Sequence, residues 1–278
     1  MKYYIKFAMR FLVLATPAIA SSILATLPSQ AATFASSESR FNINNFSSNP
    51  LSVDSLTNTV TETIGTRGKV TAKANAEAQF NPDTKNSASN WSFSQAEGQG
   101  YGYTGTANSF AAIIGYNFAV DKEFSFDFSG LFKLKTSIDD GLTERANASG
   151  ELSYQLFDSD SGALLDSFNI YGNLSTLGNN DAFVVKPSSS ITLDLNQNSI
   201  DKSFGGKKEY ASTSFKGKYS RTFDKSTHLT LVEFKKNQVN VYTVPEPSTI
   251  LGSLLSCSVL GAVSIRKRKR ASSTALLG

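Results

Sequence analysis

The strongest constraint on the fold is an alternation of apolar and polar side chains with a period of two residues. In residues 69–80, KVTAKANAEAQF, apolar residues occupy every second position and polar residues lie between them. A strand places alternate side chains on opposite faces, whereas this spacing gives a helix no single apolar face. Residues 123–135, EFSFDFSGLFKLK, repeat the pattern with phenylalanines. Within them, Gly130 predicts a bulge or the close approach of another segment.

Several more segments of this type, separated by turn residues, predict an all-β fold. Without any alternation of strands and helices, the chain is expected to form an antiparallel β-sandwich, specifically a jelly-roll-like one. A β-solenoid is the alternative, although the sequence has no fixed repeat period. The residues expected to face the core are Phe124, Phe126, Phe128 and Leu193.

Turn residues separate the predicted strands. Turns are expected at residues 81–90, around Asp140-Gly141 and in DSDSG at residues 158–162. Residues 228–244, HLTLVEFKKNQVNVYTV, are expected to hold two alternating runs with a turn near Lys236-Asn237. Residues 69–243 are therefore predicted to be the sandwich.

The positive formal charge of +4 belongs to the ends of the chain. Residues 1–32 contain three basic residues and no acid, and residues 266–270 are all basic. Between them, residues 33–243 hold 19 basic and 22 acidic residues. Because the body is slightly acidic, nucleic acid is not an expected partner.

Residues 1–31 have the three parts of a secretory signal peptide. Basic residues precede the apolar run FLVLATPAIASSILATL, and small residues follow it. Cleavage is expected before Ala32, with the Ala18/Ala20 site as a second option and a retained anchor as the alternative. Residues 32–68 are rich in Ser, Thr and Asn, which predicts an extended, partly disordered lead-in.

Residues 244–270 join three features in a fixed order: a proline-containing triplet, an apolar stretch at 250–265, and a basic cluster. The triplet is Pro245, Glu246 and Pro247, and the cluster is Arg266, Lys267, Arg268, Lys269 and Arg270. As a helix, 250–265 would span roughly 24 Å, which approaches the thickness of a bilayer core. The basic cluster would stay cytoplasmic together with residues 271–278. These features predict a stop-transfer anchor.

With these residues in place, the tail resembles the PEP-CTERM sorting signal of Gram-negative bacteria and cyanobacteria. The resemblance covers residues 244–270 and does not extend to the body. It implies recognition by an exosortase, a membrane-embedded processing enzyme that acts after the secretion machinery. The protein would then be anchored transiently in the inner membrane and released to the cell surface or the extracellular matrix. A permanent single-pass anchor is the alternative.

The body offers few residue combinations that support catalysis. His228 is the only histidine and has no nucleophile motif near it, so we interpret it as a surface residue at a strand end. The only cysteine, Cys257, lies in the apolar tail, which leaves few ligands for a transition metal. No catalytic residue, metal site or cofactor is therefore predicted.

Two other motifs are interpreted as turns. GYGYTG at residues 100–105 matches a dinucleotide-binding spacing by chance, because it lies in a β-type region; its tyrosines could instead form a glycan-stacking face. DSDSG begins like a calcium loop but lacks the closing glutamate, as Asn169 stands at that position.

We therefore expect a non-catalytic surface or matrix protein, with extracellular polysaccharide as a further partner of the body. The rival expectation is a secreted enzyme that acts on polysaccharide on the same β-scaffold.

Overall fold

The structure is a computed structural model that describes residues 33–81, 86–194 and 198–244. Within these ranges the chain forms thirteen strands and no helix, which confirms the all-β prediction. The strands are β1 (Thr33–Asn44), β2 (Ser52–Gly65), β3 (Lys69–Phe80), β4 (Ser87–Gln99), β5 (Tyr103–Val120), β6 (Glu123–Ile138), β7 (Glu144–Asp158), β8 (Leu164–Ser175), β9 (Ala182–Lys186), β10 (Ile191–Leu193), β11 (Ser199–Ser203), β12 (Lys208–Thr222) and β13 (Thr227–Thr243). The predicted signal peptide, sorting triplet, apolar span and basic cluster lie outside the described residues.

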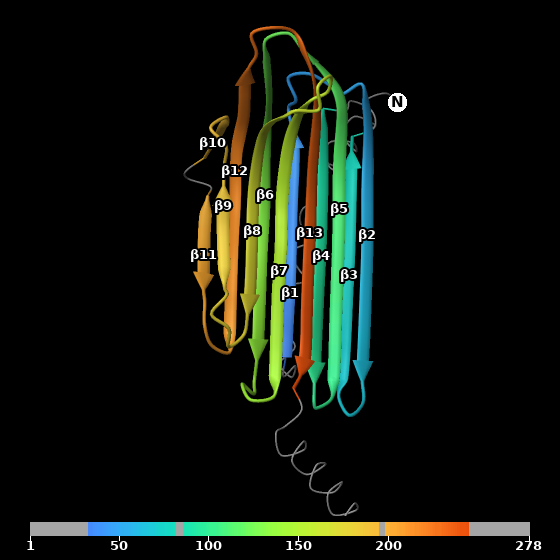
Figure 1. Cartoon of the computed structure of the whole chain (residues 1–278), viewed down its shortest axis with the longest axis vertical. Coiled ribbons are helices and arrows are strands. Elements are labelled where there is room, and N and C mark those ends of the chain that lie inside the picture. Colours follow the sequence, from blue (N-terminus) through green and yellow to red (C-terminus); the bar gives the residue numbers. More distant parts are fainter. Residues whose placement is uncertain (1–32, 82–85, 195–197, 245–278) are drawn as a thin grey trace, which may run out of the picture. The chain divides into compact units, whose positions relative to one another are not determined.

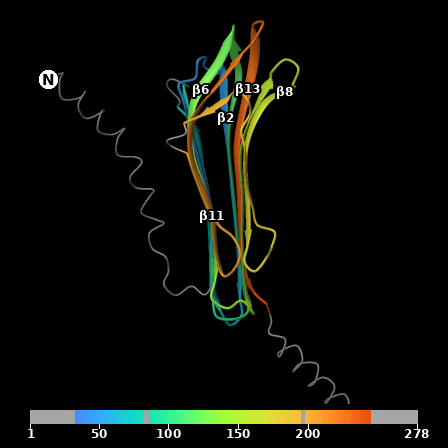
Figure 2. The same ribbon diagram turned by 90° about the vertical axis from the view of Figure 1, so that its left-hand side faces the viewer.

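The strands form two antiparallel sheets that pack face to face (Figures 1 and 2). Sheet A has the order β10-β12-β6-β1-β4-β3, with β11 also paired to β12, and sheet B has the order β2-β5-β13-β7-β8-β9. The strands are long: β5 has 18 residues, which corresponds to about 60 Å. The antiparallel sandwich prediction is confirmed at this level.

The sandwich begins earlier than the sequence predicted. Residues 32–68 were expected to form a partly disordered lead-in, but they contribute β1 and β2. β1 lies inside sheet A, between β4 and β6. Its central inward-facing residues, Ser37 and Ser39, are polar, so the apolar alternation that marks a buried strand is missing there.

The predicted turn near Lys236-Asn237 is wrong, because β13 runs without interruption through these residues. It pairs with β5 on one side and with β7 on the other, and it ends at Thr243, directly before the predicted sorting tail. Its inward face reads apolar, then polar, then apolar, and the polar middle imitates a break between two strands.

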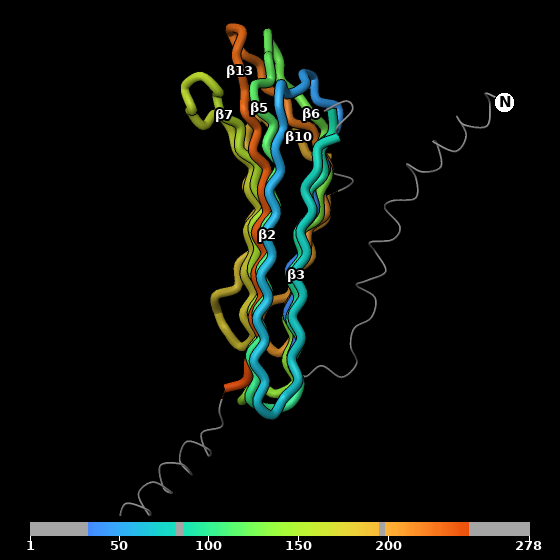
Figure 3. Tube along the Cα trace, turned by 90° about the vertical axis from the view of Figure 1, so that its right-hand side faces the viewer, coloured from blue at the N-terminus to red at the C-terminus, as the bar shows by residue number. Residues whose placement is uncertain are grey.

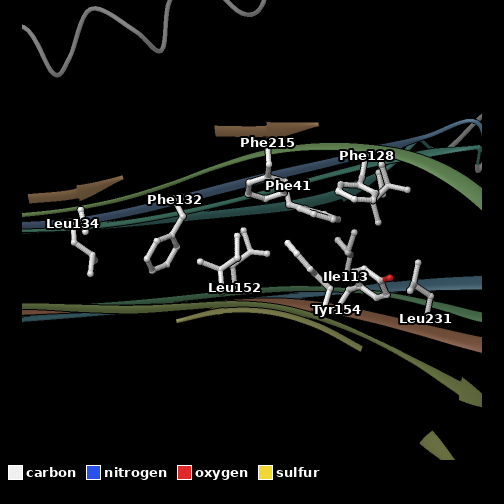
Figure 4. Packing of buried hydrophobic residues seen from close by; sticks show 14 of the residues in the cluster. Phe41, Ile113, Phe128, Phe132, Leu134, Leu152, Tyr154, Phe215 and Leu231 are labelled. Atoms are coloured by element: carbon white, nitrogen blue, oxygen red, sulfur yellow. The ribbon is translucent and has the colours of Figure 1, made fainter. Parts of the chain in front are cut away.

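Aromatic residues fill one part of the space between the sheets (Figure 4). Phe124, Phe126 and Phe128 of β6 are fully buried, as predicted, and Leu193 is partly buried against the same cluster. They meet rings from the opposite sheet, such as Tyr154 of β7. The stacking of so much apolar area between the two sheets is the main stabilisation of the fold.

Gly130 is a close-approach residue rather than a bulge. The pairing of β6 with β1 and β12 continues through it without a shift in register. A Cβ atom at Gly130 would lie 2.2 Å from Cζ of Phe215 and 2.9 Å from the carbonyl oxygen of Arg40. The glycine therefore makes room for the ring of Phe215.

One side of the sandwich is closed by a hairpin that crosses between the sheets. β2 is the edge strand of sheet B and β3 the edge strand of sheet A, and a short turn joins them (Figure 3). The alternation predicted for residues 69–80 is confirmed: Val70 and the alanines face inward and are partly buried, whereas residues such as Lys73 and Glu77 are exposed.

Candidate functional site

His228 lies on the surface at the start of β13, as predicted. Its side chain is 54% exposed, and its Nδ1 lies 3.6 Å from Oδ2 of Asp160, which is itself 76% exposed. Neither group is enclosed in a pocket that would exclude water from a reaction. The arrangement is a surface contact between a strand end and the neighbouring turn.

The motif GYGYTG covers the turn after β4 and the first three residues of β5, and no helix follows it. Gly100 and Gly102 have φ values of 86° and 67°, a left-handed conformation that glycine adopts without strain. Tyr103 is buried, and its hydroxyl bonds to that of Thr33. The glycan-stacking face that these tyrosines could have formed is therefore not present here.

In the two acidic turns, the aspartate side chains accept hydrogen bonds from groups of the same turn. In DSDSG, Oδ1 of Asp158 accepts hydrogen bonds from the backbone N–H and the hydroxyl of Ser161, both at 2.8 Å. These bonds hold the pKa of Asp158 below its usual range. Asp140 accepts a hydrogen bond from the hydroxyl of Thr143 in the same way. Throughout the described ranges, no group of His, Cys, Asp or Glu is arranged to hold a metal ion.

A cluster of aromatic and charged residues, which we call the tryptophan patch, lies on the outer face of sheet A. It consists of Arg40 of β1 and Trp91 of β4, which are partly exposed, and of Glu38 of β1 and Phe93 of β4, which are buried beside them. Trp91 lies directly opposite Arg40 in the register, and Phe93 directly opposite Glu38. Trp91 and Phe93 stack with their centroids 6.2 Å apart and their planes 14° apart.

Polar contacts hold the tryptophan patch in place. Cζ of the Arg40 guanidinium lies 5.6 Å from the centre of the Trp91 ring. Glu38 is almost fully buried, and its Oε1 accepts hydrogen bonds from Nε of Arg40 at 2.7 Å and from Nε1 of Trp91 at 3.3 Å. One carboxylate thus fixes a planar cation and a planar aromatic ring at a partly exposed surface.

A second group of side chains, which we call the polar belt, lies inside the sandwich. Its nine side chains are buried and come from both sheets: Ser37 and Ser39 of β1, Asn90, Ser92 and Ser94 of β4, Ser109 of β5, and Glu233, Lys235 and Asn237 of β13. Nine polar side chains between two packed sheets are unusual, because each loses its hydration on folding.

Asn237 connects the two sheets within the polar belt. Its Nδ2 donates to Oγ of Ser39 at 2.7 Å and to the carbonyl oxygen of Ser92 at 2.8 Å. Its Oδ1 accepts a hydrogen bond from Oγ of Ser37 at 2.6 Å. Gly150 of β7 lies beside this group, because a Cβ there would be 2.7 Å from Oδ1 of Asn237.

The other end of the polar belt holds an ion pair. Glu233 and Lys235 are both 0% exposed, and Nζ of Lys235 bonds to Oε1 of Glu233. Oε2 of Glu233 accepts a hydrogen bond from Nδ2 of Asn90 at 2.5 Å, and Nζ of Lys235 lies 5.6 Å from the centre of the Phe41 ring. Burial raises the pKa of the Glu233 carboxyl and lowers the pKa of the Lys235 ammonium to about 8.

Neither the tryptophan patch nor the polar belt was predicted from the sequence. One signal was available for the polar belt. Every second residue of β13 faces inward, and this series runs through Leu229, Leu231, Glu233, Lys235, Asn237, Val239 and Val241. No such signal marks the tryptophan patch, because its residues come together only through the register of β1 and β4.

No helix in the part of the chain that the structure describes is long and apolar enough to cross a membrane. No family model, curated protein or solved structure matches the chain.

Proposed function

We propose that this is an exported surface or matrix protein whose sandwich binds polysaccharide through the tryptophan patch without cleaving it. The observation that carries the proposal is the pairing of the Trp91 ring with Arg40 and Glu38 on an outer sheet face. An aromatic face packs against the C–H face of a sugar ring, while flanking charged groups bind its hydroxyls. A face of a sheet also suits an extended polymer better than a single small molecule.

The sequence of the tail supports the export part of the proposal. Pro245-Glu246-Pro247 begins two residues after the end of β13, and the apolar stretch at 250–265 and the basic cluster come next. The signal peptide expected at residues 1–31 would bring the body across the membrane first. An exosortase-type enzyme would then process the tail, whose span at 250–265 we propose to be a transmembrane helix. We also propose that the sandwich is jelly-roll-like. Most connections between consecutive strands pass from one sheet to the other, which supports this description.

Replacing Trp91 with alanine should weaken binding to the matrix polysaccharide by about tenfold or more, because an anchoring aromatic residue contributes roughly 2 kcal/mol. The measurement is affinity electrophoresis of the purified protein in gels that contain polysaccharide from the producing cells. Tyr171→Ala is the matched control, because Tyr171 is an exposed aromatic residue of β8, in sheet B. Equal binding by wild type and Trp91→Ala would refute the role of the patch. Release of shorter sugars during the assay would favour the rival enzyme function.

Replacing Pro245-Glu246-Pro247 with three alanines should keep the full-length chain in the inner membrane fraction. Proline fixes φ and cannot donate a hydrogen bond, so we expect the triplet to keep an extended segment between β13 and the apolar stretch. Fractionation of cells followed by immunoblotting measures this outcome. Changing residues 266–270 to serine is the comparison, which should instead weaken retention. If the alanine variant is released with its tail removed as efficiently as wild type, the sorting proposal fails.

A further inference from the structure

Three neighbouring side chains of the polar belt carry complementary chemistry. Lys235 is a primary amine, Asn90 a carboxamide and Glu233 a carboxyl group, and all are at least 97% buried. An amine, an amide carbon and a proton carrier are the components needed to exchange one amide nitrogen for another. We propose that Nζ of Lys235 and Cγ of Asn90 join in an intramolecular isopeptide bond, with Glu233 as the proton carrier.

The geometry brings the three groups together on one carboxyl. Nζ of Lys235, the attacking nitrogen, bonds to Oε1 of Glu233, and Nδ2 of Asn90, the leaving nitrogen, donates to Oε2. Nδ2 also donates to the carbonyl oxygen of Ala111 at 3.1 Å, which fixes the plane of the amide. A half-turn of the amide would exchange its nitrogen and oxygen but would leave Cγ in place.

The surroundings favour the reactive protonation states. The amine must be neutral to attack, and the carboxyl must be protonated to donate. Burial favours the neutral form of both groups, since it raises the pKa of Glu233 and lowers that of Lys235. The ring of Phe41, directly opposite Asn90 in the register, forms part of the apolar wall around them. Water that could compete with the amine is therefore excluded.

The reaction balances without a cofactor or an oxidant. The lone pair of Nζ attacks Cγ of Asn90, and a C–N bond forms. Glu233 gives its proton to the departing Nδ2 and takes one from Nζ. The Cγ–Nδ2 bond then breaks and ammonia leaves, so the product is a secondary amide and Glu233 is protonated again. Holding the amine and the amide on the two oxygens of one carboxyl replaces the high concentrations that this reaction needs in solution.

Asn90 is a better acceptor than Asn237, although Asn237 lies on the same strand as Lys235. The amide of Asn237 has hydrogen bonds at both ends, to Ser37 and Ser39 of β1 among others. In contrast, Oδ1 of Asn90 is buried and has no hydrogen-bond partner among the described residues. Nδ2 of Asn90, unlike that of Asn237, also donates to Glu233, the group that would give its proton to the departing nitrogen.

The cross-link would join β4 of sheet A to β13 of sheet B. A pair of buried charges alone contributes little net stability compared with apolar residues of the same size. A covalent bond between the sheets would hold them together, which gives the buried amine and carboxyl a role that an ion pair alone does not.

Mass spectrometry of the full chain, purified from the cells that produce it and digested with trypsin, tests the proposal. Trypsin should fail to cut after Lys235 and should release one branched peptide of residues 86–122 joined to 226–236. The mass of this peptide should be lower than the sum of its two parts by one ammonia. Fragmentation should place the link at Asn90 and Lys235.

Two variants separate the chemistry from the fold. Glu233→Gln keeps the size of the side chain and one acceptor oxygen but cannot carry the proton, so its two peptides should be recovered separately at full mass. Lys236→Arg changes the exposed neighbour on the opposite face of β13, and its branched peptide should persist. Recovery of unlinked peptides from the wild type would overturn the proposal and leave a structural ion pair only. A branched peptide joined at any other pair of residues would overturn it as well.

Discussion

Phe126→Ala is expected to lower the free energy of unfolding by about 3–5 kcal/mol, because it removes a large side chain that its neighbours cannot replace. The ring of Phe126 is fully buried and lies within 6.3 Å of five other aromatic rings. These belong to Phe46, Phe124, Phe128, Tyr154 and Tyr219. Phe46 lies in the loop after β1 and the other four come from the two sheets, so the cavity could close only if the packed layers shifted against each other.

Chemical denaturation of the purified protein, followed by tryptophan fluorescence, measures this loss. Phe204→Ala is the matched control: Phe204 lies just after β11, is 38% exposed and contacts Lys202. Its replacement should cost no more than about 1 kcal/mol. Similar losses for the two variants would show that the aromatic cluster is not the main stabilising core.

Asn237→Leu is expected to cost about 2–4 kcal/mol, although leucine is more hydrophobic and close in size. The change leaves the hydroxyls of Ser37 and Ser39 without their partner inside the sandwich, and such buried groups are costly when unpaired. Denaturation curves of the two proteins give the difference. Gln238→Leu, at the next position on the exposed face of β13, should change the stability by no more than about 0.5 kcal/mol.

A triple variant tests the cause of this effect. Replacing Ser37 and Ser39 by alanine in the Asn237→Leu background removes the hydroxyls that had lost their partner. Part of the lost stability should then return, since an apolar replacement of both partners costs less than the removal of one. Ser37→Ala and Ser39→Ala each have a separate cost in the wild-type protein. If the triple variant is less stable than Asn237→Leu by the sum of these two costs, unpaired hydroxyls are not the reason for the lost stability.

The sequence predicted well where local patterns report directly on burial. The phenylalanines of β6 alternate with polar residues because one face of that strand packs into the core and the other faces out. The turns at Asp140 and Asp158 were predicted for a similar reason, since their acidic side chains bond to nearby backbone groups. These features depend on a few neighbouring residues, so a single sequence contains them.

The failures have one physical cause. Ser37 and Asn237 face the core, but their burial depends on partners that are 200 residues away along the chain. Without those partners, a polar residue in a strand is most simply interpreted as exposed or as part of a turn. The tryptophan patch depends in the same way on the pairing of β1 with β4. Long-range register determines these sites, and local periodicity does not contain it.

The position of β13 determines how this sandwich would respond to a pulling force. The tail leaves from an inner strand of sheet B, whereas the tryptophan patch lies on sheet A. Tension between a membrane anchor and a bound polymer would therefore slide the sheets past each other. Within sheet B, β13 is hydrogen-bonded along both sides, so many bonds would have to break together rather than one after another. Between the sheets, the resistance would fall on Asn237 and its partners, and on a covalent link at Lys235.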